Sequence, residues 1–289
     1  MKEAHINGLE LEVDERRSHV VFIGRYSMAT FLNDVRCFLL DMDGTFFLGN
    51  ELLPGALDFM EALAQKGIDY LFLTNNSSKH AGLYAEKIRK LGFDVPVEKI
   101  FTSGEATTIY LNRLKPGAKV YLVGTQALED EFKRSGFVLT ADNPDYAVLG
   151  FDTTLTYEKL IIFCDLVRAG KPYIATHPDF NCPVPNGFIP DIGSFMALIE
   201  ASTGRKADVI IGKPNVHIVD AVVQKTGYSK DQIAMIGDRL YTDIAMGMAG
   251  IKTILVLSGE TEREDLQDSP FQPDLVADNL GNILKLWTK

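Results

Sequence analysis

The segment Leu40-Asp41-Met42-Asp43-Gly44-Thr45 decides the predicted fold. It follows the apolar residues Phe38 and Leu39, which indicate a buried strand, and it places two carboxylates just past the end of that strand. Ligands of open parallel α/β sheets bind beyond the carboxyl ends of the strands. Two acidic side chains at such a point would repel each other, and a divalent cation between them is the simplest solution. The alternative is a turn in which both aspartates cap backbone amides.

Outward from this segment, short apolar runs alternate with amphipathic stretches, which is the pattern of βα units around a parallel sheet. Pro54-Gly55 predicts the start of a helix and Gly67 its end, while Ser77 or Ser78 is expected to cap the next helix. The proline-rich stretch His177–Gly193 predicts an exposed loop. The predicted strands cover residues 38–40, 70–73, 119–123, 146–150, 173–175, 209–211, 233–236 and 253–257.

The interval between Thr74 and Lys213 is far longer than the dozen or so residues of one crossover connection, so a second domain is expected there. Its own βα pattern predicts that it contains a sheet. In the first residues of the chain, the polar–apolar alternation of Glu10–Asp14 is compatible with a short edge hairpin. We therefore predict an N-terminal extension at 1–33, a main domain made of 34–115 and 206–289, and an inserted α/β domain at 116–205.

The charge balance narrows the classes of partner. The chain has 29 Lys and Arg against 39 Asp and Glu, a net charge of −10, and this sign disfavours nucleic acid as a partner. An anionic substrate would need a cation to receive it. The 3 cysteines show no C-x-x-C spacing, which fits a reducing compartment. No signal peptide is apparent, and no run approaches the roughly 18 apolar residues that cross a bilayer. We expect a cytoplasmic protein without a membrane partner.

Three further segments also follow predicted buried strands. Thr74-Asn75-Asn76 precedes a helix, whose N-terminus is a ready site for an anion. Gly212-Lys213-Pro214 presents an ammonium group suited to a phosphoryl oxygen. Gly237-Asp238-Arg239-Leu240-Tyr241-Thr242-Asp243 adds two more acids. Each segment alone has an ordinary explanation as a cap, a loop or a charged turn. Their shared position after buried strands, in this order, favours one common site.

These four segments resemble the four motifs of the haloacid dehalogenase superfamily, in the same sequence order, over the chain from about Val35 to its end. The resemblance implies a Rossmann-like core, a three-layer α/β/α arrangement with a mainly parallel sheet, and an inserted α/β cap. It also implies phosphoryl transfer with Mg²⁺. Carboxylate, carbonyl and water ligands suit this hard cation, and phosphoryl transfer depends chiefly on positioning and charge neutralisation.

The resemblance assigns a role to each motif residue. Asp41 would be the nucleophile that forms an aspartyl-phosphate, and Asp43 the general acid and then the base that activates water. The phosphoryl group would be held by Gly44, Thr74, Asn75, Asn76 and Lys213. The carboxylates of Asp41 and Asp238 and the backbone carbonyl of Asp43 would bind Mg²⁺, while Asp243 would support the metal or its waters.

The chain resembles the NagD-like branch of this superfamily in the length of its inserted segment and in the sequence Leu257-Ser258-Gly259-Glu260-Thr261. This branch includes nitrophenyl phosphatases and has a cap of type IIA. In that branch the cap contributes substrate contacts. The loop His177–Pro183, with Asp179 and Asn181, is the best candidate for them, and its alternative is an ordinary surface loop. A homodimer through the cap is compatible with the resemblance, although composition does not show one.

We therefore expect a Mg²⁺-dependent phosphatase that hydrolyses small phosphorylated metabolites: a sugar phosphate, a nucleoside monophosphate, phosphoglycolate or an aryl phosphate. One alternative is a phosphomutase on the same core. Another is a non-catalytic, phosphate-sensing protein of the same fold, which need not keep both a nucleophile and an acid/base. A nucleotide-binding domain is disfavoured, because Pro214 stands where the P-loop pattern needs Ser or Thr.

Overall fold

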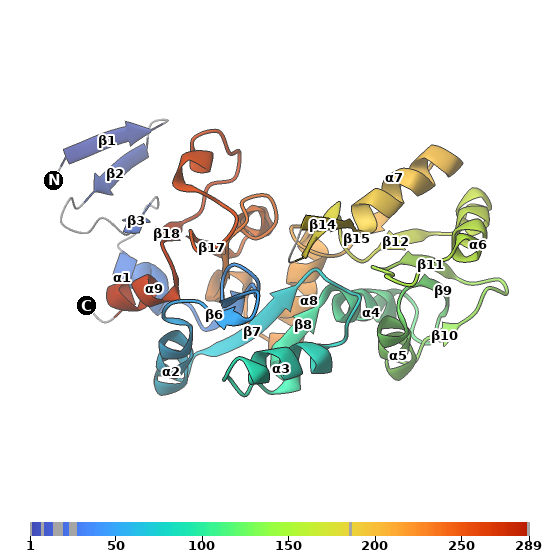
Figure 1. Ribbon diagram of the computed structural model, residues 1–289, viewed down its shortest axis with the longest axis horizontal. Helices are drawn as coiled ribbons and strands as arrows, with labels where there is room; N and C mark the ends of the chain where they lie inside the picture. The colour runs from blue at the N-terminus through green and yellow to red at the C-terminus, as the bar shows by residue number, and fades with distance from the viewer. Residues whose placement is uncertain (1, 7–8, 14–19, 23–27, 185–186, 288–289) are drawn as a thin grey trace. The chain divides into compact units, whose positions relative to one another are not determined.

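The structure is a computed structural model that describes residues 2–6, 9–13, 20–22, 28–184 and 187–287 (Figure 1). Its contacts divide the chain into two units, and each is described separately. The first unit contains residues 1–73, 88–95 and 223–289, and the second contains residues 74–87 and 96–222. The predicted cap boundaries at residues 116 and 205 stay a prediction. No helix in the described part of the chain is long and apolar enough to span a membrane.

A mainly parallel sheet forms the centre of the first unit. Its strands lie in the order β3-β18-β17-β16-β4-β7, and only β3 at the edge runs antiparallel to its neighbour. Every residue of β4 and β16 is buried, because central parallel strands are covered on both faces. The bounds are β3 Val20–Phe22, β4 Cys37–Leu40, β7 Asp69–Thr74, β16 Ile233–Gly237, β17 Lys252–Val256 and β18 Leu275–Ala277.

Two helices of this unit meet through a close backbone contact. A Cβ added to Gly55 would lie only 2.2 Å from the Cα of Gly281, so α2 (Ala56–Lys66) and α9 (Leu280–Trp287) approach more closely than side chains would allow. Phe38 packs under both helices, with its ring centroid 5.6 Å from that of Phe59 and 5.4 Å from that of Trp287. The helix predicted between Gly55 and Gly67 is confirmed, and Gly67 ends it in the left-handed conformation.

The second unit contains its own parallel sheet, in the order β10-β9-β11-β12-β15. The side chains of Phe163 and Tyr173 pack edge to face in its core, with ring centroids 5.1 Å apart. Cys164 is buried in the same core, as expected for a small apolar residue. The strands are β9 Lys119–Val123, β10 Val138–Leu139, β11 Tyr146–Leu149, β12 Tyr173–Ala175 and β15 Val209–Ile210.

Four described helices of this unit begin at a residue whose side-chain oxygen accepts a backbone N–H. These residues are Thr102 before α4, Thr125 before α5, Thr156 before α6 and Asp191 before α7. The remaining bounds in this unit are β8 Ile100–Thr102, α4 Ser103–Leu114, α5 Gln126–Arg134, α6 Tyr157–Arg168, α7 Ile192–Thr203 and α8 Val216–Thr226.

The shorter elements complete the chain. Strands β1 (Lys2–Ile6) and β2 (Leu9–Val13) pair antiparallel in a sheet of their own, so the alternation in Glu10–Val13 lies in a hairpin that is not the edge of another sheet, while Asp14 lies outside the described residues. Strand β3, which joins the first unit's sheet, was not predicted. The other bounds are α1 Met28–Asn33, β5 Phe47–Leu48, β6 Glu51–Leu52 and α3 Ala81–Lys90, with short 3₁₀ helices at Val97–Lys99, Lys230–Gln232, Ile244–Ala249 and Arg263–Leu266.

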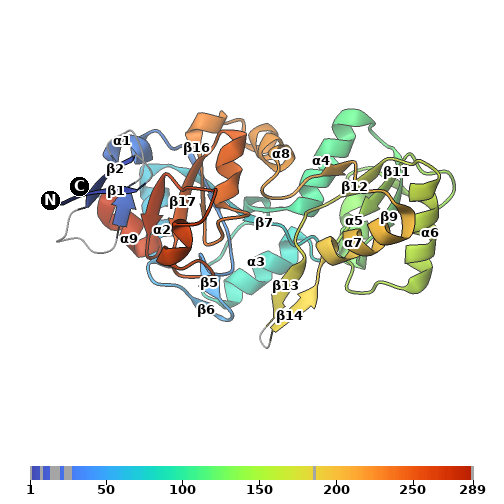
Figure 2. The same ribbon diagram turned by 90° about the horizontal axis from the view of Figure 1, so that it is seen from above.

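Two local predictions were wrong or incomplete. Ser77 and Ser78 do not cap α3, which begins only at Ala81; the Nδ1 atom of His80 accepts the N–H of Gly82 there instead. The stretch 177–193 is not a plain loop. It contains the antiparallel strands β13 (Asn181–Val184) and β14 (Gly187–Pro190), which form a separate two-stranded sheet (Figure 2).

Candidate active site

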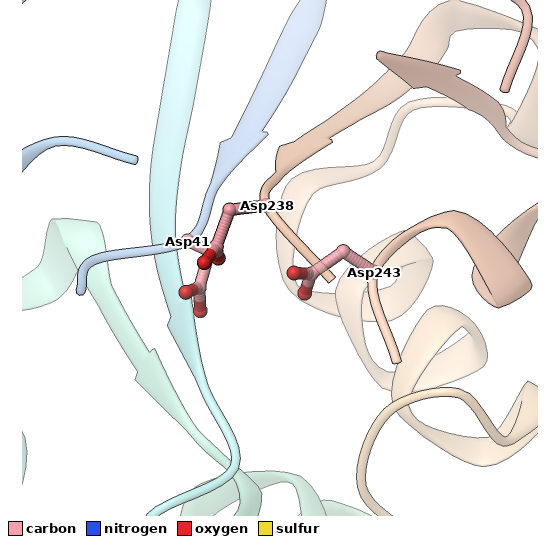
Figure 3. A group of neighbouring side chains, drawn as sticks. All are labelled: Asp41, Asp238 and Asp243. Atoms are coloured by element: carbon pink, nitrogen blue, oxygen red, sulfur yellow. The ribbon is translucent and has the colours of Figure 1, made fainter. Parts of the chain in front are cut away.

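Pairing of neighbouring parallel strands brings the first acidic residues together. Leu40 of β4 lies opposite Ile236 of β16, and the N–H of Asp41 donates to the carbonyl of Ile236 over 2.9 Å. Asp41 and Asp238 therefore leave the sheet side by side at its carboxyl edge, where α/β sheets bind ligands. Asp243 comes from the turn after β16, and Figure 3 shows its carboxylate turned toward the other two.

The carboxylates of Asp41, Asp238 and Asp243 form one group. Each offers an oxygen, and these oxygens all lie within 4.8 Å of one another. Asp238 and Asp243 are buried, with 2% and 0% of their surface exposed, and Asp41 is half-buried. Mg²⁺ binds oxygen ligands at about 2.1 Å, so three carboxylate oxygens gathered this closely could serve as ligands of one divalent cation.

Glycines make room for these carboxylates. A Cβ added to Gly44 would lie 2.3 Å from the Oδ2 atom of Asp238, and one added to Gly259 would lie 2.0 Å from the same atom. Gly44 also has a φ of +81°, in the left-handed region that favours glycine. A Cβ on Gly237 would lie 2.2 Å from the Cγ atom of Asp243. The acidic group therefore depends on three positions without a side chain.

The Asp238 carboxyl is strongly perturbed. Burial first, and then the neighbouring charges of Asp41 and Asp243, raise its pKa to about 8. Its Oδ2 atom accepts the N–H of Glu260 over 2.8 Å, whereas its buried Oδ1 atom has no hydrogen-bond partner among the described residues. A buried carboxylate oxygen without a donor, crowded by two other carboxylates, is the arrangement expected around a cation. The residues present therefore fit a bound Mg²⁺ ion.

Arg239 directly follows Asp238 in the sequence motif, which predicted no role for it. In the structure it lies among the charges of the acidic group. Burial lowers its pKa, but the charges of Asp41, Asp238 and Glu260 outweigh that effect and raise it overall. Its Nε atom lies 2.8 Å from the Oε2 atom of Glu260, and the hydroxyl of Tyr241 donates to Oε1 of the same carboxylate over 2.8 Å. The sequence signal that could have indicated this role is the position of a cationic residue directly after Asp238. Arg239 partly offsets the acidic group.

The backbone turns sharply after Asp41. The carbonyl of Met42 accepts the N–H groups of Phe46 and Phe47 over 3.0 and 3.1 Å, and the N–H of Gly44 donates to the carbonyl of Phe47 over 2.8 Å. Asp43 lies in this turn with its side chain exposed, outside the group of three carboxylates. Its carboxylate is therefore not one of the three clustered groups, and the metal contact expected through its backbone carbonyl stays a prediction.

The remaining predicted residues belong to the second unit, where Asn75 and Lys213 are bound to each other. The Lys213 N–H donates to the Oδ1 atom of Asn75 over 2.7 Å, and the Nδ2 atom of Asn75 donates to the Lys213 carbonyl over 3.0 Å. Both residues are buried. A Cβ on Gly212 would lie 2.6 Å from the Oδ1 atom of Asn75, so a glycine before the lysine permits this contact. The Thr74 hydroxyl accepts the N–H of Asn76 over 3.1 Å.

Of the two predicted substrate-binding residues in the 177–183 loop, Asp179 meets this pair and Asn181 is exposed. Both carboxylate oxygens of Asp179 accept from the Nδ2 atom of Asn75, over 3.2 and 3.1 Å. Asn181 begins β13, and its side chain faces solvent. Sequence reasoning did not predict the Asn75–Asp179 bond, because nothing local marks a partner so distant in the chain.

Known families match both ends of the chain. A model described as haloacid dehalogenase-like hydrolase matches residues 38–138, and a HAD-hydrolase-like model matches residues 210–283. Among characterised proteins, the acid sugar phosphatase of Staphylococcus aureus (strain MRSA252) is 36% identical over 244 residues, which is 84% of this chain and 94% of that protein.

Solved structures are also similar. The 4-nitrophenylphosphatase of Thermotoga maritima is 51% identical, with a TM-score of 0.86 over 88% of this chain and 98% of that one. NagD from E. coli K-12 is 33% identical, with a TM-score of 0.80 over 86% of this chain and 97% of that one. These likenesses extend over most of both chains.

Proposed function

The chain belongs to the haloacid dehalogenase-like hydrolases as a NagD-like phosphatase, and we propose that it hydrolyses phosphomonoesters of small metabolites with Mg²⁺ as its cofactor. The observation that carries the proposal is the group of Asp41, Asp238 and Asp243. Three carboxylates within 4.8 Å, one with its pKa raised to about 8 and with a buried oxygen lacking a partner, suit a divalent cation.

Asp41 is the proposed nucleophile. One of its carboxylate oxygens attacks phosphorus, the ester oxygen leaves, and an aspartyl-phosphate forms on Asp41; water then attacks phosphorus and releases phosphate. Arg239 supports this role, because its positive charge lies close enough to the Asp41 carboxylate to have its own pKa raised by it.

Asp43 is the proposed general acid and base. It stands one residue beyond Asp41 in the turn and its side chain is exposed, so it can exchange a proton with a leaving group or with water. In the first step it protonates the departing oxygen, and in the second it takes a proton from the attacking water. When bound, Mg²⁺ would be held by the carboxylates of Asp41 and Asp238 and the carbonyl of Asp43, with Asp243 beside them, and would neutralise the phosphate charge.

The phosphoryl group is proposed to be held by five residues: Gly44, the Thr74 hydroxyl, the backbone of Asn75 and Asn76, and the Lys213 ammonium. The order of the motifs and the family membership support this assignment. Within the second unit, the paired hydrogen bonds between Asn75 and Lys213 fix the backbone of the lysine. A fixed point charge on the transferring group is what phosphoryl transfer requires.

Sugar phosphates are the proposed substrate class, because the Staphylococcus aureus relative is named an acid sugar phosphatase. Aryl phosphates such as 4-nitrophenyl phosphate are convenient reporters, since the Thermotoga maritima relative is named for that activity. We further propose a cytoplasmic location and a homodimer through the cap.

The experiment is a hydrolysis screen over sugar phosphates, nucleoside monophosphates, phosphoglycolate and 4-nitrophenyl phosphate, with Mg²⁺ and with EDTA, for the natural chain and for Asp41→Asn. We expect hydrolysis with Mg²⁺, none with EDTA, and none in the variant. Asp34→Asn, at an exposed aspartate before β4, is the matched control and should keep full activity. Free phosphate in none of these reactions would overturn the proposal, as would isomerisation of a sugar phosphate without release of phosphate.

A further inference from the structure

A buried imidazole lies at the start of the stretch 177–193 in the second unit. His177 is fully buried, and its Nε2 atom lies 2.9 Å from the Oδ1 atom of Asp191, which is also buried. Its Nδ1 atom lies 3.2 Å from the hydroxyl of Thr176. None of the proposed catalytic steps uses His177 or Asp191. A buried polar network in which every group has a partner holds the segments around it rigidly.

The hydrogen bonds around His177 form one directed chain. The N–H of Phe151 donates to the Ser77 hydroxyl over 3.0 Å, and that hydroxyl lies 2.9 Å from the Thr176 hydroxyl. If Ser77 donates to Thr176 and Thr176 donates to Nδ1, then Nε2–H donates to Asp191, and every group in this series of hydrogen bonds has a partner. This series of hydrogen bonds joins the segment after β7 to the residues after β12.

Asp191 closes the base of the loop formed by residues 178–184 and 187–190. Besides the imidazole, its Oδ1 atom accepts the N–H of Ile192 over 2.7 Å, so it also caps α7. The backbone closes the same base, since the Asp191 N–H donates to the Phe180 carbonyl over 2.9 Å and the Gly193 N–H to the Asp179 carbonyl over 2.7 Å. A Cβ on Gly193 would lie 2.6 Å from the Pro178 carbonyl oxygen, so the two ends of the loop pack tightly.

The closed loop carries one polar group toward the phosphate-binding residues. Asp179 accepts from the Nδ2 atom of Asn75 at both oxygens, and Asn75 is bound to Lys213. The Ser103 hydroxyl connects the two groups: it donates to the Asn75 carbonyl, and it lies 3.4 Å from the Nδ1 atom of His177. The position of Asp179 relative to Lys213 therefore depends on how the base of the loop is held. An ionised carboxylate accepts hydrogen bonds only, so a substrate hydroxyl is a fitting partner for Asp179.

We propose that His177 and Asp191 are a positioning pair: they hold the loop so that Asp179 recognises a hydroxyl of the substrate beyond its phosphate group. This inference rests on the proposed phosphatase function and deepens it. The pair selects for hydroxyl-bearing phosphomonoesters such as sugar phosphates over aryl phosphates, which have no hydroxyl to offer. Losing the pair raises KM for the sugar phosphate and leaves its kcat within a few fold, because the groups that react are untouched.

The test compares kcat/KM for the best sugar phosphate of the screen with kcat/KM for 4-nitrophenyl phosphate. In His177→Phe and Asp191→Ala we expect the ratio of the two values to fall roughly 10-fold. Asp191→Asn keeps an oxygen that accepts from Nε2–H and should keep the ratio. Thr156→Ala is the matched control, because it removes the corresponding cap from α6 without touching the loop. An unchanged ratio in both His177→Phe and Asp191→Ala overturns the inference.

Hydrogen exchange separates failure of this inference from failure of the proposed function. The amides of residues 178–184 should exchange faster in His177→Phe and Asp191→Ala than in the natural chain, and at the natural rate in Thr156→Ala. This readout needs no turnover, so it tests the positioning pair even if the natural chain hydrolyses no phosphomonoester. Unchanged exchange in the first two variants overturns the positioning role. If one of them does not fold, the other carries both measurements.

Discussion

Asn75 and Lys213 are joined by two hydrogen bonds, one from the Lys213 N–H to the Asn75 Oδ1 atom over 2.7 Å and one from the Asn75 Nδ2 atom to the Lys213 carbonyl over 3.0 Å. An amide side chain presents a donor and an acceptor together, which a carboxylate does not. The contact explains why a buried lysine, 4% exposed, has a fixed backbone. It also makes Asn75 a sensitive position for substitution.

Asn75→Asp should lower kcat about 10- to 100-fold, because displacement of a charged group by an ångström or so has costs of this order. The variant loses its bond to the Lys213 carbonyl and places a carboxylate against that of Asp179. Steady-state kinetics on 4-nitrophenyl phosphate measure the effect. Asn112→Asp is the matched control, since Asn112 makes one hydrogen bond to the Ser135 carbonyl. Equal activity in the two variants would contradict the prediction.

Mg²⁺ should stabilise the protein against heat. A ligand at about 100 times its Kd adds about 2.7 kcal/mol, which corresponds to a rise in Tm of roughly 4 °C for a chain of 289 residues. Asp238→Asn should abolish this rise, because it removes a proposed ligand. Scanning calorimetry with EDTA and with added Mg²⁺ gives both values. A full Mg²⁺-dependent rise in Asp238→Asn would show that the metal binds elsewhere.

The metal-free protein should also show the effect of the Asp238 carboxyl on stability. Its pKa is raised to about 8 in the folded chain, against about 4 when unfolded. Its contribution to the free energy of unfolding is therefore fully present below about pH 4 and is lost as the pH rises through about 8. In EDTA, Asp238→Asn should therefore gain stability relative to the natural chain as the pH increases over this range. Urea unfolding at several pH values measures the difference, and a difference independent of pH would contradict the raised pKa.

Gly259→Ala should weaken Mg²⁺ binding and lower kcat at least about 10-fold, because the new Cβ would lie 2.0 Å from the Oδ2 atom of Asp238 and must displace it. Gly247→Ala is the control. Its Cβ would meet only the Thr253 side chain, at 3.4 Å, which is ordinary contact. The dependence of activity on Mg²⁺ concentration measures both variants. Identical dependence in the two would show that Gly259 does not shape the site.

Local sequence patterns were sufficient to predict most strands of the two parallel sheets, though not β10 or β18, and the convergence of Asp41, Asp238 and Asp243. Asp41 and Asp238 each follow an apolar run, and parallel strands end at a common edge, so pattern and topology together bring these two near one another. Asp243 follows Asp238 by five residues in the same motif. The NagD-like assignment and the α/β fold are confirmed by the comparisons. The same reasoning explains why β3 was missed: its three residues, Val20–Phe22, are too few to show a period.

Contacts between distant parts of the chain were not predictable. Ser77 has the residue type and place of a helix cap, yet its hydroxyl binds Thr176 and the N–H of Phe151 instead. The Asn75–Asp179 bond and the Arg239–Glu260 ion pair likewise join segments that no local pattern relates. Helix and cap propensities describe the local preference of a residue type, whereas the packing of the whole unit determines where these side chains lie.

The most direct test of the proposed mechanism is to trap the phosphorylated aspartate. The natural chain is mixed with 4-nitrophenyl phosphate and Mg²⁺, quenched within the first turnovers and reduced with tritiated borohydride, which converts an aspartyl-phosphate to labelled homoserine. Peptide mass spectrometry and radioactivity should place the label at residue 41, with more of it in Asp43→Asn, where attack by water is slowed, and none in Asp41→Asn. Label at another residue, or turnover in Asp41→Asn at the natural rate, would contradict the assignment of Asp41 as the nucleophile.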